Sequence, residues 1–103
     1  MDFAQVVKFK DTVKAEDGKA EKKILINTDT FRLIAIAIGK KGELAAHPAP
    51  GNAVITALKG EATITYDGKD YKLEEGDFFY MEKGVVHSLK ADKKFEMTVA
   101  ISL

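Results

Sequence analysis

The 103-residue chain has no cysteine, and only two of its residues are histidine. Without cysteine the protein can form no disulfide, no thiolate zinc site and no cysteine nucleophile. The same absence fits a reducing compartment. The amino-terminal stretch MDFAQVVKFKD lacks the long apolar core of a cleavable signal, and no run approaches the roughly twenty apolar residues that a membrane span needs. We therefore expect a cytoplasmic protein with no membrane partner.

The chain also lacks an excess of either charge, because 16 basic residues balance 16 acidic ones. Nucleic-acid binding usually needs a basic excess gathered on one face. The lysine pairs at 22–23, 40–41 and 93–94 are dispersed, and acidic residues lie near most of them. The charge pattern therefore predicts a solvated surface and no nucleic-acid partner.

Helical periodicity is absent as well, and short β-branched runs separated by turn residues take its place. Pro48 and Pro50 prevent a helix from starting after the run at 43–47. The Asp67-Gly68 pair, with alternating residues on both sides, predicts a two-residue hairpin turn. About eight to ten strands with turns every eight to twelve residues indicate an all-β, antiparallel sandwich or barrel.

The length predicts a single domain spanning residues 1–103. Within it, residues 1–20 form an amino-terminal extension or an edge strand, since FAQVVKF could pair at a sheet edge. The polar stretch that follows, DTVKAEDGKAE, predicts a loop or one helical turn. Residues 30–103 form the barrel core.

The two histidines lie in HPAPGNAVITALKG, residues 47–60, and GDFFYMEKGVVH, residues 76–87. These two stretches resemble the paired motifs of the cupin family. When His47 is placed on the first histidine of the first motif, Gly60 falls on its closing glycine. Gly76, Gly84 and His87 match the second motif with its usual spacing. The resemblance covers roughly residues 30–103 and implies a small, single-domain cupin of type 2. It implies an antiparallel double-stranded β-helix, the cupin jelly-roll barrel, with the three glycines in tight turns that need unusual dihedral angles.

The chain departs from both motifs at the positions that usually bind metal. Ala49 stands in place of the second histidine and Ala53 in place of the glutamate. The second motif has Glu82 at its proline position and Ala91 at its asparagine position. Of the four usual ligands only the two histidines remain, so the resemblance implies the fold and a degenerate metal motif.

Two imidazoles alone leave most of a transition metal's coordination sphere to water or substrate. Functional zinc and iron sites usually have at least three protein ligands, and Glu43 and Glu82 are the nearest acidic candidates in sequence. We therefore predict no native metal. A divalent transition metal (zinc, nickel, iron or manganese) on His47 and His87 is the alternative.

Side-chain alternation indicates which residues share the interior face with the histidines. Either Phe79 or the pair Phe78 and Tyr80 faces inward, and Met81 and Met97 can fill irregular gaps. The predicted ligand-binding residues are His47, His87, Ala53, Ile55, Phe79, Met81, Val85 and Leu89. Such a lining favours a small apolar or aromatic ligand.

Three functions compete on this evidence. The first is a cupin that binds a small apolar or aromatic metabolite without metal. The second is a metal-dependent cupin enzyme, of dioxygenase or isomerase type, with a two-histidine centre. The third is a dimerisation scaffold with an empty barrel. No sequence signature identifies a catalytic residue, although a histidine can act as a general base.

The sequence also predicts a homodimer. FAQVVKF and ILI (24–26) carry more apolar surface than one small barrel can bury. Open strand edges are liabilities that proteins cover or pair, and twofold symmetry is the commonest closure.

Overall fold

The structure is a computed structural model that describes all 103 residues. One three-residue 3₁₀ helix, η1 (Phe9–Asp11), precedes nine strands. The strands are β1 (Ala20–Asn27), β2 (Phe31–Ile38), β3 (Glu43–Pro48), β4 (Asn52–Lys59), β5 (Glu61–Tyr66), β6 (Lys69–Glu74), β7 (Phe78–Met81), β8 (Val86–Ala91) and β9 (Phe95–Ser102). No helix in the structure has the length and apolar character required to traverse a membrane.

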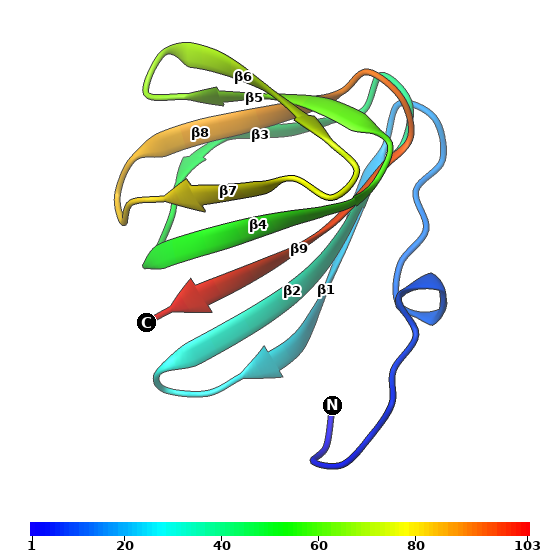
Figure 1. Ribbon diagram of the computed structural model, residues 1–103, viewed down its shortest axis with the longest axis vertical. Coiled ribbons are helices and arrows are strands. Elements are labelled where there is room, and N and C mark those ends of the chain that lie inside the picture. The colour runs from blue at the N-terminus through cyan, green and yellow to red at the C-terminus, as the bar shows by residue number, and fades with distance from the viewer.

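The strands form two sheets that face each other (Figure 1). The larger sheet has the order β1-β2-β9-β4-β7, and the smaller sheet has the order β3-β8-β5-β6. Every pairing is antiparallel. The predicted all-β jelly-roll fold is confirmed, and β1 and β3 are each left at an edge of their sheets.

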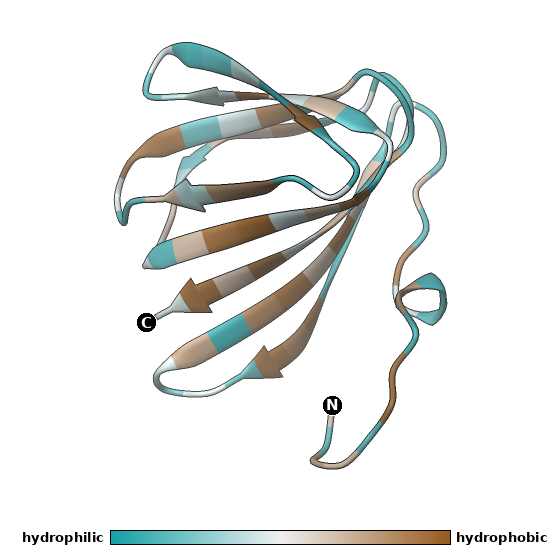
Figure 2. Cartoon of the chain, viewed as in Figure 1, coloured by the Kyte–Doolittle hydropathy of each residue, from teal (hydrophilic) through white to brown (hydrophobic).

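The main core lies between the two sheets because alternate side chains of each strand point inward. β9 shows this most clearly, since Phe95, Met97, Val99 and Ile101 are all buried while the residues between them are not. In Figure 2 the apolar residues follow β2, β4 and β9 along the larger sheet. This alternation turns the sequence pattern directly into a two-layer core.

β2 is apolar on both faces, and its outer face is covered by the amino-terminal extension. Ala35 and Ala37 are fully buried there against Val13, and Phe9 packs on the same cluster. The alternative that FAQVVKF forms an edge strand is wrong, because residues 1–8 contain no strand. The extension covers the outer face of the sheet, where apolar side chains need burial, and does not extend its edge.

The turns follow the predicted glycine positions. Asp67 and Gly68 both have positive φ, 50° and 80°, as a two-residue hairpin turn of type I′ requires. Gly60 has a φ of 84°, and a Cβ atom there would collide with the backbone carbonyl of Lys94. Gly76 and Gly84 also have positive φ. The dihedral angles predicted for the motif glycines are therefore confirmed.

Candidate functional site

The structure brings the two histidines together on neighbouring strands. His47 of β3 pairs directly with His87 of β8 in the sheet register. Their ring centroids lie 4.5 Å apart, with the ring planes tilted by 57°. The His87 side chain is buried, with 4% of its surface exposed, while His47 is exposed. The two stretches of sequence therefore contribute to one site, which runs from the surface into the barrel.

A β-bulge in β3 gives His47 its inward orientation. Leu44 pairs with Leu89 and His47 pairs with His87, so three residues of β3 match two of β8. In a regular strand, residues three apart would point to opposite faces. The extra residue in the Ala45–Ala46 segment lets both Leu44 and His47 face the interior, and bulges re-aim side chains in this way.

Both imidazoles are held by the same local hydrogen bond. His47 Nδ1 lies 2.9 Å from the carbonyl oxygen of Ala45, and His87 Nδ1 lies 3.1 Å from that of Val85. A carbonyl oxygen only accepts, so in each ring Nδ1 carries the proton and Nε2 presents a lone pair when the ring is neutral. Neither Nε2 atom has a hydrogen-bond partner in the protein. Every fully buried side-chain nitrogen and oxygen does have such a partner. The His87 Nε2 is therefore not fully buried, and a ligand in the cavity can reach it.

Burial favours the neutral form of His87. Desolvation lowers the pKa of His87 below its ordinary 6.5, and the nearby His47 lowers it further. The hydrogen bond to Val85 opposes these effects and raises the pKa. Because the net shift is downward, His87 presents a neutral imidazole, and hence an Nε2 acceptor, at physiological pH.

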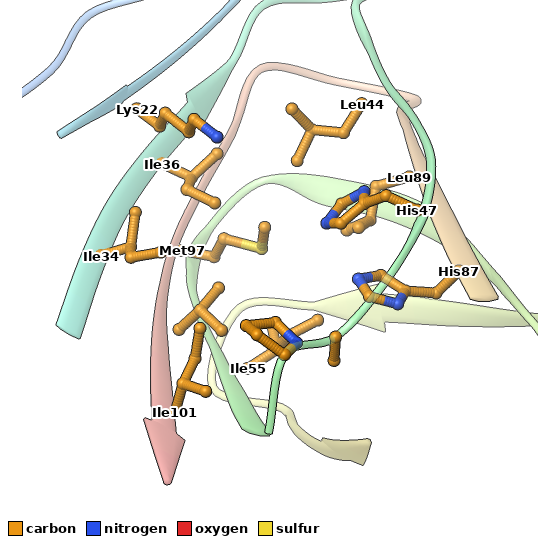
Figure 3. Close-up of a pocket in the computed structure, with 13 residues that line it drawn as sticks. Lys22, Ile34, Ile36, Leu44, His47, Ile55, His87, Leu89, Met97 and Ile101 are labelled. Carbon is orange, nitrogen blue, oxygen red and sulfur yellow. The ribbon is translucent and has the colours of Figure 1, made fainter. Parts of the chain in front are cut away.

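The histidines form one wall of a cavity between the two sheets, with a volume of about 90 Å³ (Figure 3). The residues that line it are Lys22, Ile34, Ile36, Leu44, His47, Ala49, Pro50, Ile55, His87, Leu89, Met97, Val99 and Ile101. An apolar cavity of about 150 Å³ holds benzene. By that scale this cavity has room for an apolar group of about four carbon atoms.

The cavity has a dry floor and a wetter rim. Ile55, Leu89 and Met97 form buried floor residues, together with His87. The exposed lining residues are Lys22 of β1, His47 of β3 and Pro50. Since β1 and β3 are both edge strands, the cavity opens where the two sheets are not joined by a ladder. No acidic side chain lines it.

Half of the predicted ligand-binding residues line this cavity, namely His47, His87, Ile55 and Leu89. The structure places Ala53 and Met81 in the solid core and Val85 in the turn before β8. The Phe79 ring faces inward, but it packs against the rings of Tyr66 and Tyr71. Phe78 and Tyr80 are exposed on the other face of β7. These placements correct the predicted wall, since alternation identified inward-facing residues but not which of them border empty space.

Other lining residues escaped the sequence reasoning. Leu44 was hidden by the bulge, and Pro50 was interpreted only as a turn residue. Ala49 was assigned to the second-histidine position of the motif but was not predicted to bind a ligand. Lys22 was counted as surface charge, although it lies two residues after Ala20, which packs against the core. Residues two apart in a strand share a face, so the inward position of Ala20 indicates that Lys22 faces inward too. Met97 was predicted only to fill gaps. The remaining lining residues also come from β2 and β9, which alternation alone does not relate to the histidine motif.

The donor atoms at this site do not fit a three-ligand metal centre. No group of three or more histidine, cysteine, aspartate or glutamate side chains is close enough to hold a metal ion. Glu43 and Glu82 are exposed and lie outside the cavity lining, and Glu43 lies 4.0 Å from Lys90 in an ion pair. Ala49 and Ala53, at the two missing ligand positions, are buried and have no donor atom in their side chains.

Comparisons with known proteins agree with this fold. A conserved protein of unknown function from Streptococcus pyogenes superposes with a TM-score of 0.86 at 27% identity, covering 99% of this chain and 90% of that one. An uncharacterised protein from Aquifex aeolicus is 25% identical over 99 residues, which cover 94% of this chain and 82% of the relative.

An enzyme shares the fold at greater distance. A salicylate 1,2-dioxygenase variant from Pseudoaminobacter salicylatoxidans superposes with a TM-score of 0.74 at 22% identity, over 80% of this chain and 26% of the enzyme. At that identity the likeness concerns the fold alone. The family model of the cupin domain matches residues 32–102, and the chain therefore belongs to the cupin family.

Proposed function

We propose that this cupin binds a small, mostly apolar molecule in the cavity between its sheets, without a resident metal. The observation that carries the proposal is the pair of imidazoles whose Nδ1 atoms are fixed by backbone carbonyls. Their Nε2 atoms are free to accept a hydrogen bond at the wall of an otherwise apolar cavity. Small-molecule sites commonly combine apolar walls with a few placed polar groups.

The cavity volume favours a short aliphatic group over an aromatic ring. At about 0.8 kcal/mol for each buried CH₂, four carbons contribute about 3 kcal/mol. A hydrogen bond to Nε2 adds about 1 kcal/mol. A gross energy of this size corresponds to a dissociation constant of about a millimolar, so the expected ligand is an abundant metabolite or one that also makes contacts at the rim.

The competing proposal is a metal-dependent enzyme of dioxygenase or isomerase type. It would need zinc, nickel, iron or manganese held by His47 and His87 and a third ligand from outside the motifs. The two exposed glutamates nearest the motifs do not supply one. The donor set therefore supports metal-free binding, and no residue is assigned a catalytic role.

Methyl NMR with a set of small aliphatic alcohols and acids tests the binding proposal. We expect ligand-dependent shifts at the methyl groups of Ile55, Leu89 and Met97 in the wild type. In Ala49→Leu the added carbons should fill the cavity and abolish the shifts, whereas Ala46→Leu, on the exposed part of β3, should leave them intact. Shifts that survive Ala49→Leu would contradict the proposal.

We also propose that the protein is a homodimer, as its amino-terminal surface suggests. Phe3 and Val6 are almost fully exposed, and they border a hollow formed with Leu25, Ile26 and the start of β2. β1 leaves one edge of its ladder unpaired beside this surface, so a second copy would cover both an apolar patch and an open edge.

Light scattering at micromolar concentration tests the homodimer. The full chain should have twice the mass of one chain, and the double variant Phe3→Ser, Val6→Ser should have the mass of a monomer. Gln5→Ser on the same segment serves as the control and should remain dimeric. A monomeric wild type would refute the proposal. The cytoplasmic location and the absence of nucleic-acid and membrane partners remain predictions that rest on composition and charge.

A further inference from the structure

We infer that the cavity takes a small aliphatic monocarboxylate, and that Lys22 binds its carboxylate. This inference rests on the proposed function and specifies the chemistry of the ligand. Lys22 is the only charged side chain among the thirteen that line the cavity. Figure 3 shows its amine directed toward the cavity, on the side opposite the two histidines.

The register of β1 explains why this lysine, and not its neighbour, reaches the cavity. Lys22 pairs with Ile36, whose side chain also lines the cavity. Lys23 pairs with Ala35, which belongs to the cluster on the outer face of the sheet. The two lysines therefore lie on opposite faces of one strand.

Lys22 has no anionic partner within the protein. The four ion pairs of the structure involve Lys19, Lys72, Lys90 and Lys93. No acidic residue lines the cavity, so the ammonium group of Lys22, at the exposed rim, has no opposing charge there. A ligand that brings one negative charge would complete the pairing, whereas a dianion would leave one charge without a partner.

The two ends of the cavity then recognise different parts of one molecule. The ammonium group attracts a carboxylate, so the carboxylate lies at the Lys22 side of the rim, opposite the two imidazoles. The aliphatic body extends toward Ile55 and Met97 on the floor. A hydroxyl group on that body can donate the hydrogen bond that an Nε2 atom accepts. Because only about four carbons fit, 3-hydroxyisovalerate, with its four-carbon body and one hydroxyl group, is a suitable probe.

An inward-pointing lysine on an edge strand has another known use, which is to prevent edge-to-edge pairing between sheets. That role predicts a change of oligomeric state when Lys22 is replaced, and no effect on ligand selectivity. The carboxylate role predicts the reverse. The two explanations are therefore separated by measuring both properties on the same variants.

The experiment compares 3-hydroxyisovalerate with its neutral amide by methyl NMR titration. In the wild type we expect the carboxylate to bind at least about tenfold more tightly. Lys22→Met should reduce the ratio to about one, Lys22→Arg should retain most of the preference, and Lys23→Met should behave as the wild type. Thermal unfolding of each variant checks that the fold is preserved.

The outcomes distinguish the inference from the proposed function. If both compounds shift the cavity methyls with equal affinity, Lys22 binds no carboxylate, but the cavity still binds small molecules. If the preference persists in Lys22→Met, or that variant changes only the oligomeric state, the inference is overturned. If neither compound shifts the cavity methyls in the wild type, the inference and the proposed function both fail.

Discussion

The two sides of the sandwich are closed in different ways. On the side of β6 and β7, which we call the closed side, the rings of Tyr66, Phe79 and Tyr71 pack with centroid separations of 5.3 and 5.2 Å. On the side of β1 and β3, the open side, two imidazoles and a lysine surround a cavity. Both sides show the same strand alternation, so alternation produces the core and the residue sizes decide where it stays hollow.

The two sides also differ in whether their polar groups have hydrogen-bond partners within the chain. The Tyr66 hydroxyl on the closed side accepts a hydrogen bond from the backbone N–H of Glu82, 2.9 Å away, and so has a partner within the chain. The Nε2 atoms of His47 and His87 on the open side have none. A side with satisfied groups stabilises the fold, whereas a side with free acceptors is available to a ligand.

The largest expected effect comes from removing the aromatic contact of the closed side. Phe79→Ala should lower the free energy of unfolding by about 2–3 kcal/mol, because it deletes a large, partly buried ring. Phe78→Ala changes the adjacent ring, which is 73% exposed, and should cost at most about 0.5 kcal/mol. Urea unfolding of the two variants measures the difference, and equal losses would show that the inward-facing ring of Phe79 contributes no more than the exposed ring of Phe78.

Added carbons should cost more stability in the solid core than at the cavity. Ala53→Leu lies in the solid core and should cost about 1–3 kcal/mol through overpacking. Ala49→Leu borders the cavity, so its added carbons occupy existing space and should cost less stability than those of Ala53→Leu. Unfolding curves of the pair measure both values. A comparable loss in Ala49→Leu would mean that the cavity cannot accept added carbons.

The smallest expected effect is a pH dependence that belongs to the open side. Because the pKa of His87 is lowered in the folded protein, the unfolded state binds more protons between that pKa and 6.5. Stability should therefore fall as the pH decreases below about 7, and should stop falling below the folded-state pKa. The urea midpoint at pH 7.5, 6.5 and 5.5 measures this trend.

His87→Gln is the variant that isolates this contribution. It should flatten the decline over the same pH interval, since it removes the buried group that must remain neutral. His47→Gln should retain most of the decline, because burial is the largest cause of the His87 shift and His47 the smallest. An unchanged slope in His87→Gln would assign the decline to other groups.

Much of the fold could be predicted from local residue patterns. The β-branched runs, the Asp67-Gly68 turn and the spaced glycines specify strands and turns through short-range sterics, and the structure has them where expected. The meeting of His47 and His87 was also predictable, because the two motifs imply adjacent strands. These features depend on neighbours in sequence or on one known pairing.

The cavity wall was less predictable because it depends on contacts between sheets. The bulge between Leu44 and His47 changes which residues of β3 face the interior. No residue type in that segment indicates that a bulge is present. Phe79 and Met81 do face inward, but on the closed side, where neighbouring side chains fill the space. Lys22 was hidden by its charge, which ordinarily indicates a surface position.

Elemental analysis of untagged protein, purified without added metal or chelator, tests the central claim most directly. The central claim is that the open side binds a small organic molecule through two imidazoles and holds no metal of its own. We predict well below one equivalent of zinc, nickel, iron and manganese per chain. About one equivalent of a single metal would contradict the claim and would require a third ligand from outside the cavity wall.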